Sequence, residues 1–248
     1  QFADKRVFYY GSLLLPFLLS ADAAGSNFGT AKRADTKLPP AVVKHLAQVM
    51  ANIHNIPLDR QAAWVNDSHF GKWLDFGSAR QNTLARLAEW RAQGKAARIF
   101  PSPHIARTLR WLETNVPDDD GPPVFLHGDY GPHNILLDGN RVGAVLDWEI
   151  STPGDPAYDV CWFLNCTAGA VDRAEFLAYY RDAGGKPISE YKLRYFEVFA
   201  CMFMPVTCNA SLRLIEDNDA ANINLAVYGL QFPYEYARRL QGAIERAE

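Results

Sequence analysis

The sequence has little of what a membrane-spanning, secreted or nucleic-acid-binding protein needs. Its longest strongly apolar run, 13–19, is too short to cross a bilayer and is interrupted by Pro16. No basic segment leads into a long apolar stretch at the N-terminus, so no secretory signal is expected. The 25 Lys and Arg are outnumbered by 28 Asp and Glu, and the net charge of −3 argues against a nucleic-acid partner. We therefore expect a cytoplasmic protein with neither a membrane nor a nucleic-acid partner.

Cysteine is also scarce, with four in the chain and no CxxC pair among them. None lies at zinc-finger spacing from a histidine. All four stand in apolar segments, which predicts buried free thiols rather than a disulfide framework or metal ligands. They are Cys161, Cys166, Cys201 and Cys208.

The rest of the composition is that of an ordinary globular protein, with 48% hydrophobic and 21% charged residues. Apolar residues at helical spacing, ended by Pro or Gly, predict helices at 41–55, 81–93, 103–115, 158–167, 172–183, 188–213 and 218–245. Short strands are predicted within 1–30 and at 124–126, 134–137 and 142–148, with a turn at 138–140. The outline is a small β-containing N-terminal piece and a mostly helical remainder that carries one hairpin.

Three polar residues stand where these short strands meet loops. Asp129 follows the strand at 124–126, Asn134 opens the next strand, and Asp147 ends the third. We expect all three to project from the same end of one small antiparallel sheet. Two carboxylates and an amide oxygen suit Mg²⁺, and phosphoryl transfer needs such a set. The five-residue step from Asp129 to Asn134, with an Asp downstream, matches the spacing of the kinase pattern H-R-D-x-x-x-x-N.

Three linked motifs make this pattern specific: HGDYGPHN at 127–134, LDWE at 146–149 and GDPAYD at 154–159. In this order they resemble the aminoglycoside phosphotransferase and choline kinase superfamily of small-molecule kinases. The resemblance is strong from about 125 to 163 and weaker elsewhere. It implies an α+β, protein-kinase-like bilobal fold, with a reduced or incompletely represented N-lobe and a large helical C-lobe that carries a catalytic β-hairpin.

The resemblance also implies roles for the residues of the first two motifs. Asp129 would be the catalytic base, while Asn134 and Asp147 would bind Mg²⁺. His127 would brace the catalytic loop. Two interpretations of Glu149 stay open: it points at the substrate hydroxyl, or it is a solvated neighbour.

Beyond these catalytic roles, the resemblance implies supporting ones. Asp155 and Asp159 would orient the catalytic loop through hydrogen bonds to its backbone or to His127, without touching substrate. Backbone groups of Ser20 and Ala21 would meet the adenine of ATP at the interlobe hinge. Four further residues are expected to have no part in the chemistry: His54 as a structural residue, His133 as a packing or solvent-exposed histidine, and Trp148 and Trp162 as core residues.

The same resemblance divides the chain. Residues 1–22 would be a remnant of the N-lobe and hinge, and 23–248 the C-lobe. Within the C-lobe, the catalytic hairpin would cover 124–159, and the helical substrate-binding region would cover 58–115 and 160–248. No Gly-rich phosphate loop can be placed, so whether the N-lobe is truncated or lies outside the given chain stays open.

Taken together, the motifs predict an ATP- and Mg²⁺-dependent phosphotransferase acting on a hydroxyl of a small molecule. Lys5 is a candidate for the phosphate-binding lysine. The apolar, Met- and aromatic-rich segment 199–206 favours a partly apolar acceptor. The residues of the LDWE and GDPAYD motifs also resemble those of the branch found in acyl-CoA dehydrogenase homologues, which favours a hydroxyacyl-CoA. The alternatives are an aminoglycoside phosphotransferase and a non-catalytic nucleotide-binding pseudokinase. A protein kinase is disfavoured because no D-F-G or A-P-E element occurs.

Overall fold

The structure is a computed structural model that describes residues 26–27, 37–58, 77–96, 103–118, 121–148, 150–167, 169–216 and 236–248. In chain order these residues form β1 (Ser26–Asn27), α1 (Pro40–His54), α4 (Ala79–Ala96), α5 (Pro103–Thr114), β2 (Val124–Leu126), the 3-10 helix η1 (Pro132–Asn134), β3 (Ile135–Asp138), β4 (Arg141–Val145), β5 (Thr152–Gly154), α6 (Ala157–Thr167), α7 (Arg173–Asp182) and α8 (Glu190–Glu216). A further helix covers 236–247. The α+β class is confirmed.

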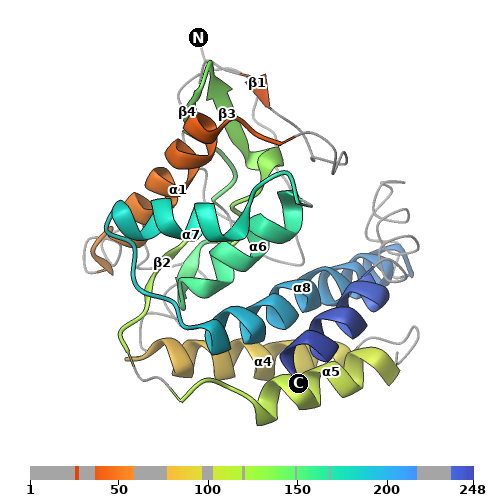
Figure 1. The fold of residues 1–248 in the computed structure, drawn as a ribbon. Helices are drawn as coiled ribbons and strands as arrows, with labels where there is room; N and C mark the ends of the chain where they lie inside the picture. The colour runs from red at the N-terminus through yellow and green to blue at the C-terminus, as the bar shows by residue number, and fades with distance from the viewer. Residues whose placement is uncertain are drawn as a thin grey trace.

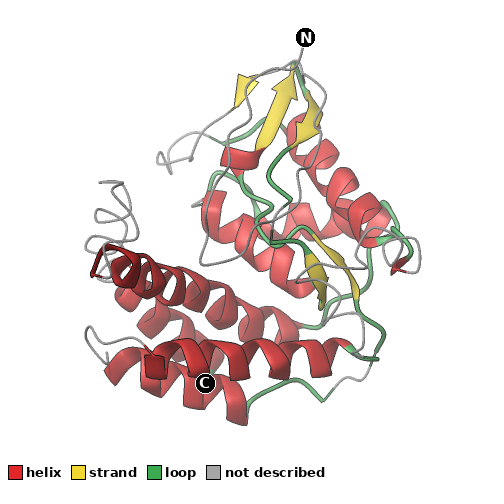
Figure 2. Cartoon of the chain, turned by 180° about the vertical axis from the view of Figure 1, so that it is seen from behind, coloured by secondary structure: helices red, strands yellow, loops and turns green. Residues whose placement is uncertain are grey.

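The elements are arranged in tiers. Strands β1, β3 and β4 lie at one end with α1, and helices α4, α5 and α8 lie at the other end beside the C-terminal helix 236–247 (Figure 1). Helices α6 and α7 lie between them, with α6 packed on α8 and α7 on α1. The view from behind shows the same separation of strands from the lower helices (Figure 2). None of the described helices is long and apolar enough to cross a lipid bilayer.

The short strands form two sheets among the described residues, which corrects the expectation of one. Strands β1, β3 and β4 make a three-stranded antiparallel sheet, and β2 pairs separately with β5. In the second sheet Phe125 lies opposite Pro153. Strand β5 was not predicted because two of its three residues, Pro and Gly, are depleted in strands. Asp129 and Asn134 therefore belong to a loop between two sheets.

Helix α1 illustrates how apolar spacing and flanking prolines predict a helix. It begins at Pro40, where a missing N–H costs nothing, and ends before Pro57. Its apolar positions Val43, Leu46 and Met50 repeat every three to four residues and are fully buried. Each such side chain contributes about 1.5–3 kcal/mol by leaving water.

An aromatic cluster holds the lower helices to the layer above. Phe199 of α8 packs against Trp90 of α4 and Tyr158 of α6, with ring centroids 4.5 and 5.6 Å apart. Tyr195 adds a hydrogen bond of 3.1 Å from its hydroxyl to the carbonyl of Leu112 on α5. This cluster fixes α6 and α8, the two helices that approach the loop after β2.

Candidate functional site

The loop after β2 is anchored by a buried carboxylate of α6. Asp159 accepts hydrogen bonds from the backbone N–H groups of His127 (2.8 Å) and Gly128 (3.0 Å). Gly128 adopts φ +85°, and a Cβ there would come within 2.5 Å of the Ile150 carbonyl oxygen, so only glycine fits. His54 of α1 lies 3.2 Å from the same carboxylate. The loop therefore starts from a fixed backbone.

His127 connects this loop to the end of β4. Its Nε2–H donates to the Leu146 carbonyl at 2.9 Å, so its Nδ1 accepts from the Asp129 N–H at 3.2 Å. Burial lowers the pKa of His127, which favours the neutral tautomer that both bonds require. The ring also packs on Trp148 with centroids 4.5 Å apart. These contacts are consistent with the expected bracing of the loop.

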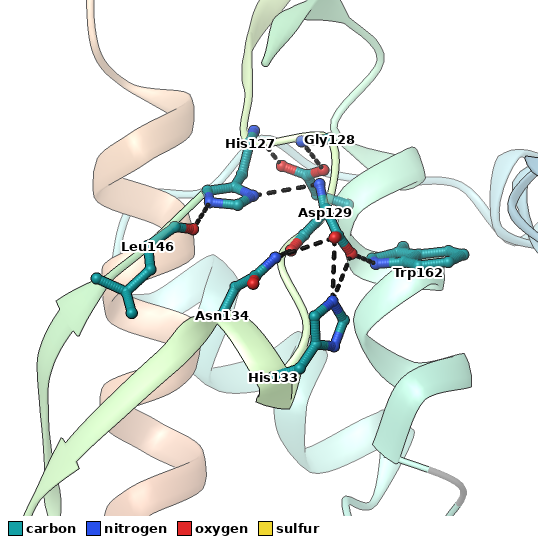
Figure 3. A network of polar contacts seen from close by, with 8 residues as sticks. His127, Gly128, Asp129, His133, Asn134, Leu146 and Trp162 are labelled. Carbon is teal, nitrogen blue, oxygen red and sulfur yellow. Dashed lines mark hydrogen bonds and ion pairs between the residues drawn. The ribbon is translucent and has the colours of Figure 1, made fainter. Parts of the chain in front are cut away.

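The Asp129 carboxylate is surrounded by three side-chain donors (Figure 3). Trp162 Nε1 donates to Oδ1 at 2.6 Å, and Asn134 Nδ2 donates to Oδ2 at 2.9 Å. His133 Nε2 lies 3.0 Å from both oxygens. Asn134 Nδ2 also reaches the Asp129 carbonyl at 3.0 Å, which closes the loop on itself. The carboxylate is thus held in one orientation.

His133 is more than a packing residue in this arrangement. The hydrogen bond to Asp129 is the main cause that raises the pKa of His133, and burial opposes it. A Cβ at Gly131 would come within 2.4 Å of the His133 ring. The absence of a side chain at position 131 therefore leaves room for the histidine. The sequence alone did not reveal this contact.

Asp147 has an unusual backbone at the end of β4. It is the one non-glycine residue with positive φ in the described part of the chain, at +62°. Such conformations cost free energy and cluster at functional sites. Partial desolvation raises the pKa of Asp147, and the nearby negative charge of Asp129 adds to that effect. The backbone N–H of Leu146, the residue before it, donates to the Asn134 carbonyl at 2.7 Å, which ties this strand end to the loop.

These residues offer oxygen atoms of the kind that Mg²⁺ binds. A divalent cation would offset the repulsion between the carboxylates of Asp129 and Asp147, and Asn134 adds an amide oxygen. Within the described ranges no group of three or more His, Cys, Asp or Glu gathers as a metal cluster. The donor set fits a cation that keeps several water or phosphate oxygens, rather than a site made of protein ligands alone.

The structure brings together five of the sequence-predicted residues: His127, Asp129, Asn134, Asp147 and Asp159. Asp155 lies elsewhere. Its Oδ1 accepts from the Ala157 N–H at 2.9 Å at the start of α6, and its Oδ2 pairs with Lys192 of α8 at 2.7 Å. It therefore orients α6 rather than bonding directly to the loop. Four predicted residues lie outside the described residues: Lys5, Ser20, Ala21 and Glu149.

Trp162 was expected to be a core residue, and it is buried, but its contact with Asp129 was missed. A signal existed: Trp162 follows Asp159 by three positions, so both lie on the same face of α6. His54 was expected to be structural. Its Nδ1 lies 2.8 Å from the Tyr180 hydroxyl and its Nε2 faces Asp159, both buried.

Comparison with known sequences gives a family match and several relatives. The sequence model of the phosphotransferase enzyme family matches residues 6–196. The chain is 37% identical over 79 residues to acyl-CoA dehydrogenase family member 11 of Gallus gallus, covering 31% of this chain and 10% of that protein. It is 32% identical over 130 residues to acyl-CoA dehydrogenase family member 10 of Mus musculus, covering 52% of this chain and 11% of that protein. It is 31% identical over 107 residues to a homoserine kinase of Rhodopseudomonas palustris, covering 40% of this chain and 32% of that protein. The chain therefore corresponds to only about a tenth of the two longer relatives.

Solved structures give a likeness of fold. A candidate aminoglycoside phosphotransferase from Ralstonia eutropha matches with a TM-score of 0.71 at 20% identity, covering 90% of this chain and 71% of that one. Plasmodium vivax ethanolamine kinase matches with a TM-score of 0.56 at 14% identity, covering 88% of this chain and 62% of that one. At these identities the likeness concerns the fold alone, and it confirms the expected kinase-like architecture.

Proposed function

Because this chain belongs to the phosphotransferase enzyme family, we propose that it transfers the terminal phosphoryl group of ATP to a hydroxyl of a small molecule in a Mg²⁺-dependent reaction. The observation that carries the proposal is the convergence of three donors on the Asp129 carboxylate. A carboxylate held in one orientation can align an acceptor hydroxyl and take its proton, which is the role of the base in phosphoryl transfer.

The proposed division of roles follows the geometry of the loop. Asp129 binds the acceptor hydroxyl, while His127 and Asp159 hold the loop backbone from the opposite side. Asn134 and Asp147 would hold Mg²⁺, which supplies neutralisation of phosphate charge when bound. The Asp147 backbone has φ +62° at the end of β4, and its carboxylate lies close enough to Asp129 for the two negative charges to interact.

The proposed acceptor is a hydroxyacyl-CoA or another partly apolar alcohol. Trp162 and Phe203 pack edge to face beside Asp129, with centroids 5.3 Å apart, so an apolar wall borders the proposed base. The matches to acyl-CoA dehydrogenase family members 10 and 11 support this class over an aminoglycoside, since the likeness to an aminoglycoside phosphotransferase concerns the fold.

The test is a phosphorylation screen by mass spectrometry with Mg²⁺ and ATP. Acceptors would include 4-hydroxyacyl-CoAs, hydroxy acids, homoserine, choline, sugars and aminoglycosides. Transfer should fall by at least a thousandfold in Asp129→Asn and stay within twofold in Asp138→Asn, a change at an exposed turn carboxylate. Equal turnover in Asp129→Asn and the wild type would refute the role of Asp129. No product from any acceptor, together with no detectable Mg²⁺-dependent binding of ATP, would favour the non-catalytic alternative.

A further inference from the structure

Three buried polar side chains from three helices lie in a row that ends at the loop after β2. Tyr180 of α7 is 1% exposed, and its hydroxyl lies 2.8 Å from Nδ1 of His54 on α1, which is 3% exposed. His54 Nε2 lies 3.2 Å from Oδ2 of Asp159 on α6. Helix α7 packs on α1, as Figure 1 shows. We call Tyr180, His54 and Asp159 the buried triad.

Each hydrogen bond of the buried triad has a definite direction. An ionised carboxylate can only accept, so His54 Nε2 carries a proton and donates it to Asp159. In the neutral ring Nδ1 is then the acceptor, and the Tyr180 hydroxyl is its donor. Burial raises the pKa of Tyr180, and the backbone N–H of Lys186 opposes that rise by hydrogen bonding to the hydroxyl oxygen. Since its oxygen accepts from Lys186, the hydroxyl directs its own proton toward His54.

The Tyr180 hydroxyl thereby selects the tautomer of His54. Which nitrogen of a neutral imidazole carries the proton is set by the hydrogen bond that the other nitrogen makes. Without the hydroxyl, the proton can move to Nδ1, and Nε2 then presents a lone pair to the Asp159 carboxylate 3.2 Å away. Two acceptors at that distance repel each other. The carboxylate would turn, and its hydrogen bonds to the N–H groups of His127 and Gly128 would weaken.

The loop carries this change to the proposed base. His127 Nδ1 accepts from the Asp129 N–H at 3.2 Å, so a shift of the His127 backbone moves the residue that would align the acceptor hydroxyl. A displacement of about 1 Å at a reacting group can cost about 100-fold in rate, even when the substituted residue lies far from the chemistry. The buried triad can therefore act on the reaction through the loop without touching the acceptor.

We propose that Tyr180 and His54 are positioning residues of the reaction: the Tyr180 hydroxyl fixes the tautomer of His54, and His54 fixes the carboxylate that holds the loop after β2. The proposal deepens the proposed function, on which its kinetic test rests. It gives helix α7 a part in the reaction, although α7 lies outside the HGDYGPHN, LDWE and GDPAYD motifs.

Gly185 offers a second way to disturb the buried triad. Its N–H donates to the Tyr180 carbonyl at 2.9 Å, and a Cβ added to it would come within 2.4 Å of the Tyr180 ring. Its φ is not positive, so alanine suits its backbone. Gly185→Ala therefore displaces the Tyr180 ring while keeping the hydroxyl. Gly77→Ala is the matched control, because a Cβ there meets only the Gln81 side chain at 3.7 Å.

The kinetic test uses the best acceptor of the phosphorylation screen. Tyr180→Phe removes one neutral hydrogen bond, so kcat should fall by about three- to tenfold. KM for ATP should stay within about twofold, because Tyr180 is not among the residues proposed to bind the nucleotide. In His54→Gln the side chain offers Asp159 an N–H₂ donor that has no tautomers. Adding Tyr180→Phe to His54→Gln should therefore change kcat by less than about twofold. Gly185→Ala should behave like Tyr180→Phe, and Gly77→Ala like the wild type.

Amide hydrogen exchange followed by NMR tests the buried triad without nucleotide or acceptor. In Tyr180→Phe and Gly185→Ala, the amides of His127 and Gly128 should exchange at least about fivefold faster than in the wild type, because their acceptor has turned. The hydrogen-bonded amide of Ala79, at the start of α4, should keep its exchange rate. A merely structural loss of stability would speed exchange at all three amides alike.

Three results would each overturn the proposal: wild-type kcat in both Tyr180→Phe and Gly185→Ala, an equal effect of Tyr180→Phe with histidine or glutamine at position 54, or unchanged exchange at His127 and Gly128. If Tyr180→Phe does not fold, Gly185→Ala carries both measurements, alone and combined with His54→Gln. Faster exchange at the two loop amides, with neither transfer nor Mg²⁺-dependent binding of ATP in the wild type, would retain the buried triad and reject the kinase function.

Discussion

The indole Nε1–H of Trp162 donates a 2.6 Å hydrogen bond to Oδ1 of Asp129, which joins helix α6 to the loop between the two sheets. The Trp162 ring is buried and packs edge to face on Phe203 of α8. A core aromatic residue therefore sets the orientation of the half-buried Asp129 carboxylate. The packing of the lower helices and the geometry of the proposed base are coupled through this one contact.

Trp162→Phe tests that coupling. Phenylalanine keeps most of the buried ring but removes the N–H, and a hydrogen bond to a charged group contributes about 1.5–3 kcal/mol. We expect kcat to fall by about 10- to 100-fold while KM for ATP stays within twofold, because the ring contacts the proposed base and is not one of the residues proposed to bind the nucleotide. Steady-state kinetics give both values. Trp111→Phe, which alters a ring that stacks on Tyr195 away from the loop, serves as the control. A wild-type kcat in Trp162→Phe would show that Asp129 needs no donor from α6.

Asp159→Asn should destabilise the fold strongly. The Asp159 side chain is buried, accepts from two loop N–H groups and faces His54. An amide in its place sets its N–H₂ group against one of those donors, and leaving a buried donor without its acceptor costs about 1–3 kcal/mol. Urea unfolding followed by circular dichroism measures the loss. The exposed Asp138→Asn should change the free energy of unfolding by less than about 0.5 kcal/mol.

His127→Asn links stability to pH. Burial lowers the pKa of His127 in the folded state, while an unfolded histidine keeps a pKa near 6.5. Below about pH 6.5 the unfolded chain therefore binds a proton that the folded one does not, and this residue's contribution to stability falls as the pH falls. The stability difference between wild type and His127→Asn should be smaller at pH 5.5 than at pH 7.5. A difference that widens at pH 5.5 would mean that the folded ring is protonated.

The buried thiols should resist alkylation. Burial raises the pKa of Cys161 well above its usual range and that of Cys201 to about 12, so at pH 8 neither forms the reactive thiolate. Iodoacetamide labelling mapped by peptide mass spectrometry should leave both unmodified in the native protein and modify both in urea. Rapid labelling of Cys161 in the native protein would contradict its packing between α6 and α8.

Much of the fold follows from local sequence. The α1 and α5 helices lie within one residue of their predicted bounds, because apolar spacing and flanking prolines mark both ends. The C-terminal helix was predicted over 218–245; the described helix covers 236–247, and the predicted start lies outside the described residues. Strand β5 escaped prediction because it owes its existence to pairing with β2, which no local pattern records. The division of the chain after residue 22 stays a prediction.

The family, and the chemistry proposed for the loop, could be predicted from the sequence. The motifs place Asp129, Asn134 and Asp147 at strand and loop junctions, and their order alone identified the family. Only the tertiary structure decided what holds them. Residues distant in sequence, such as Trp162 on Asp129 and Arg246 on Glu197, meet because α6, α8 and the C-terminal helix bury their apolar faces together. Burial of a shared core depends on all of these helices at once, so no short segment of sequence can specify it.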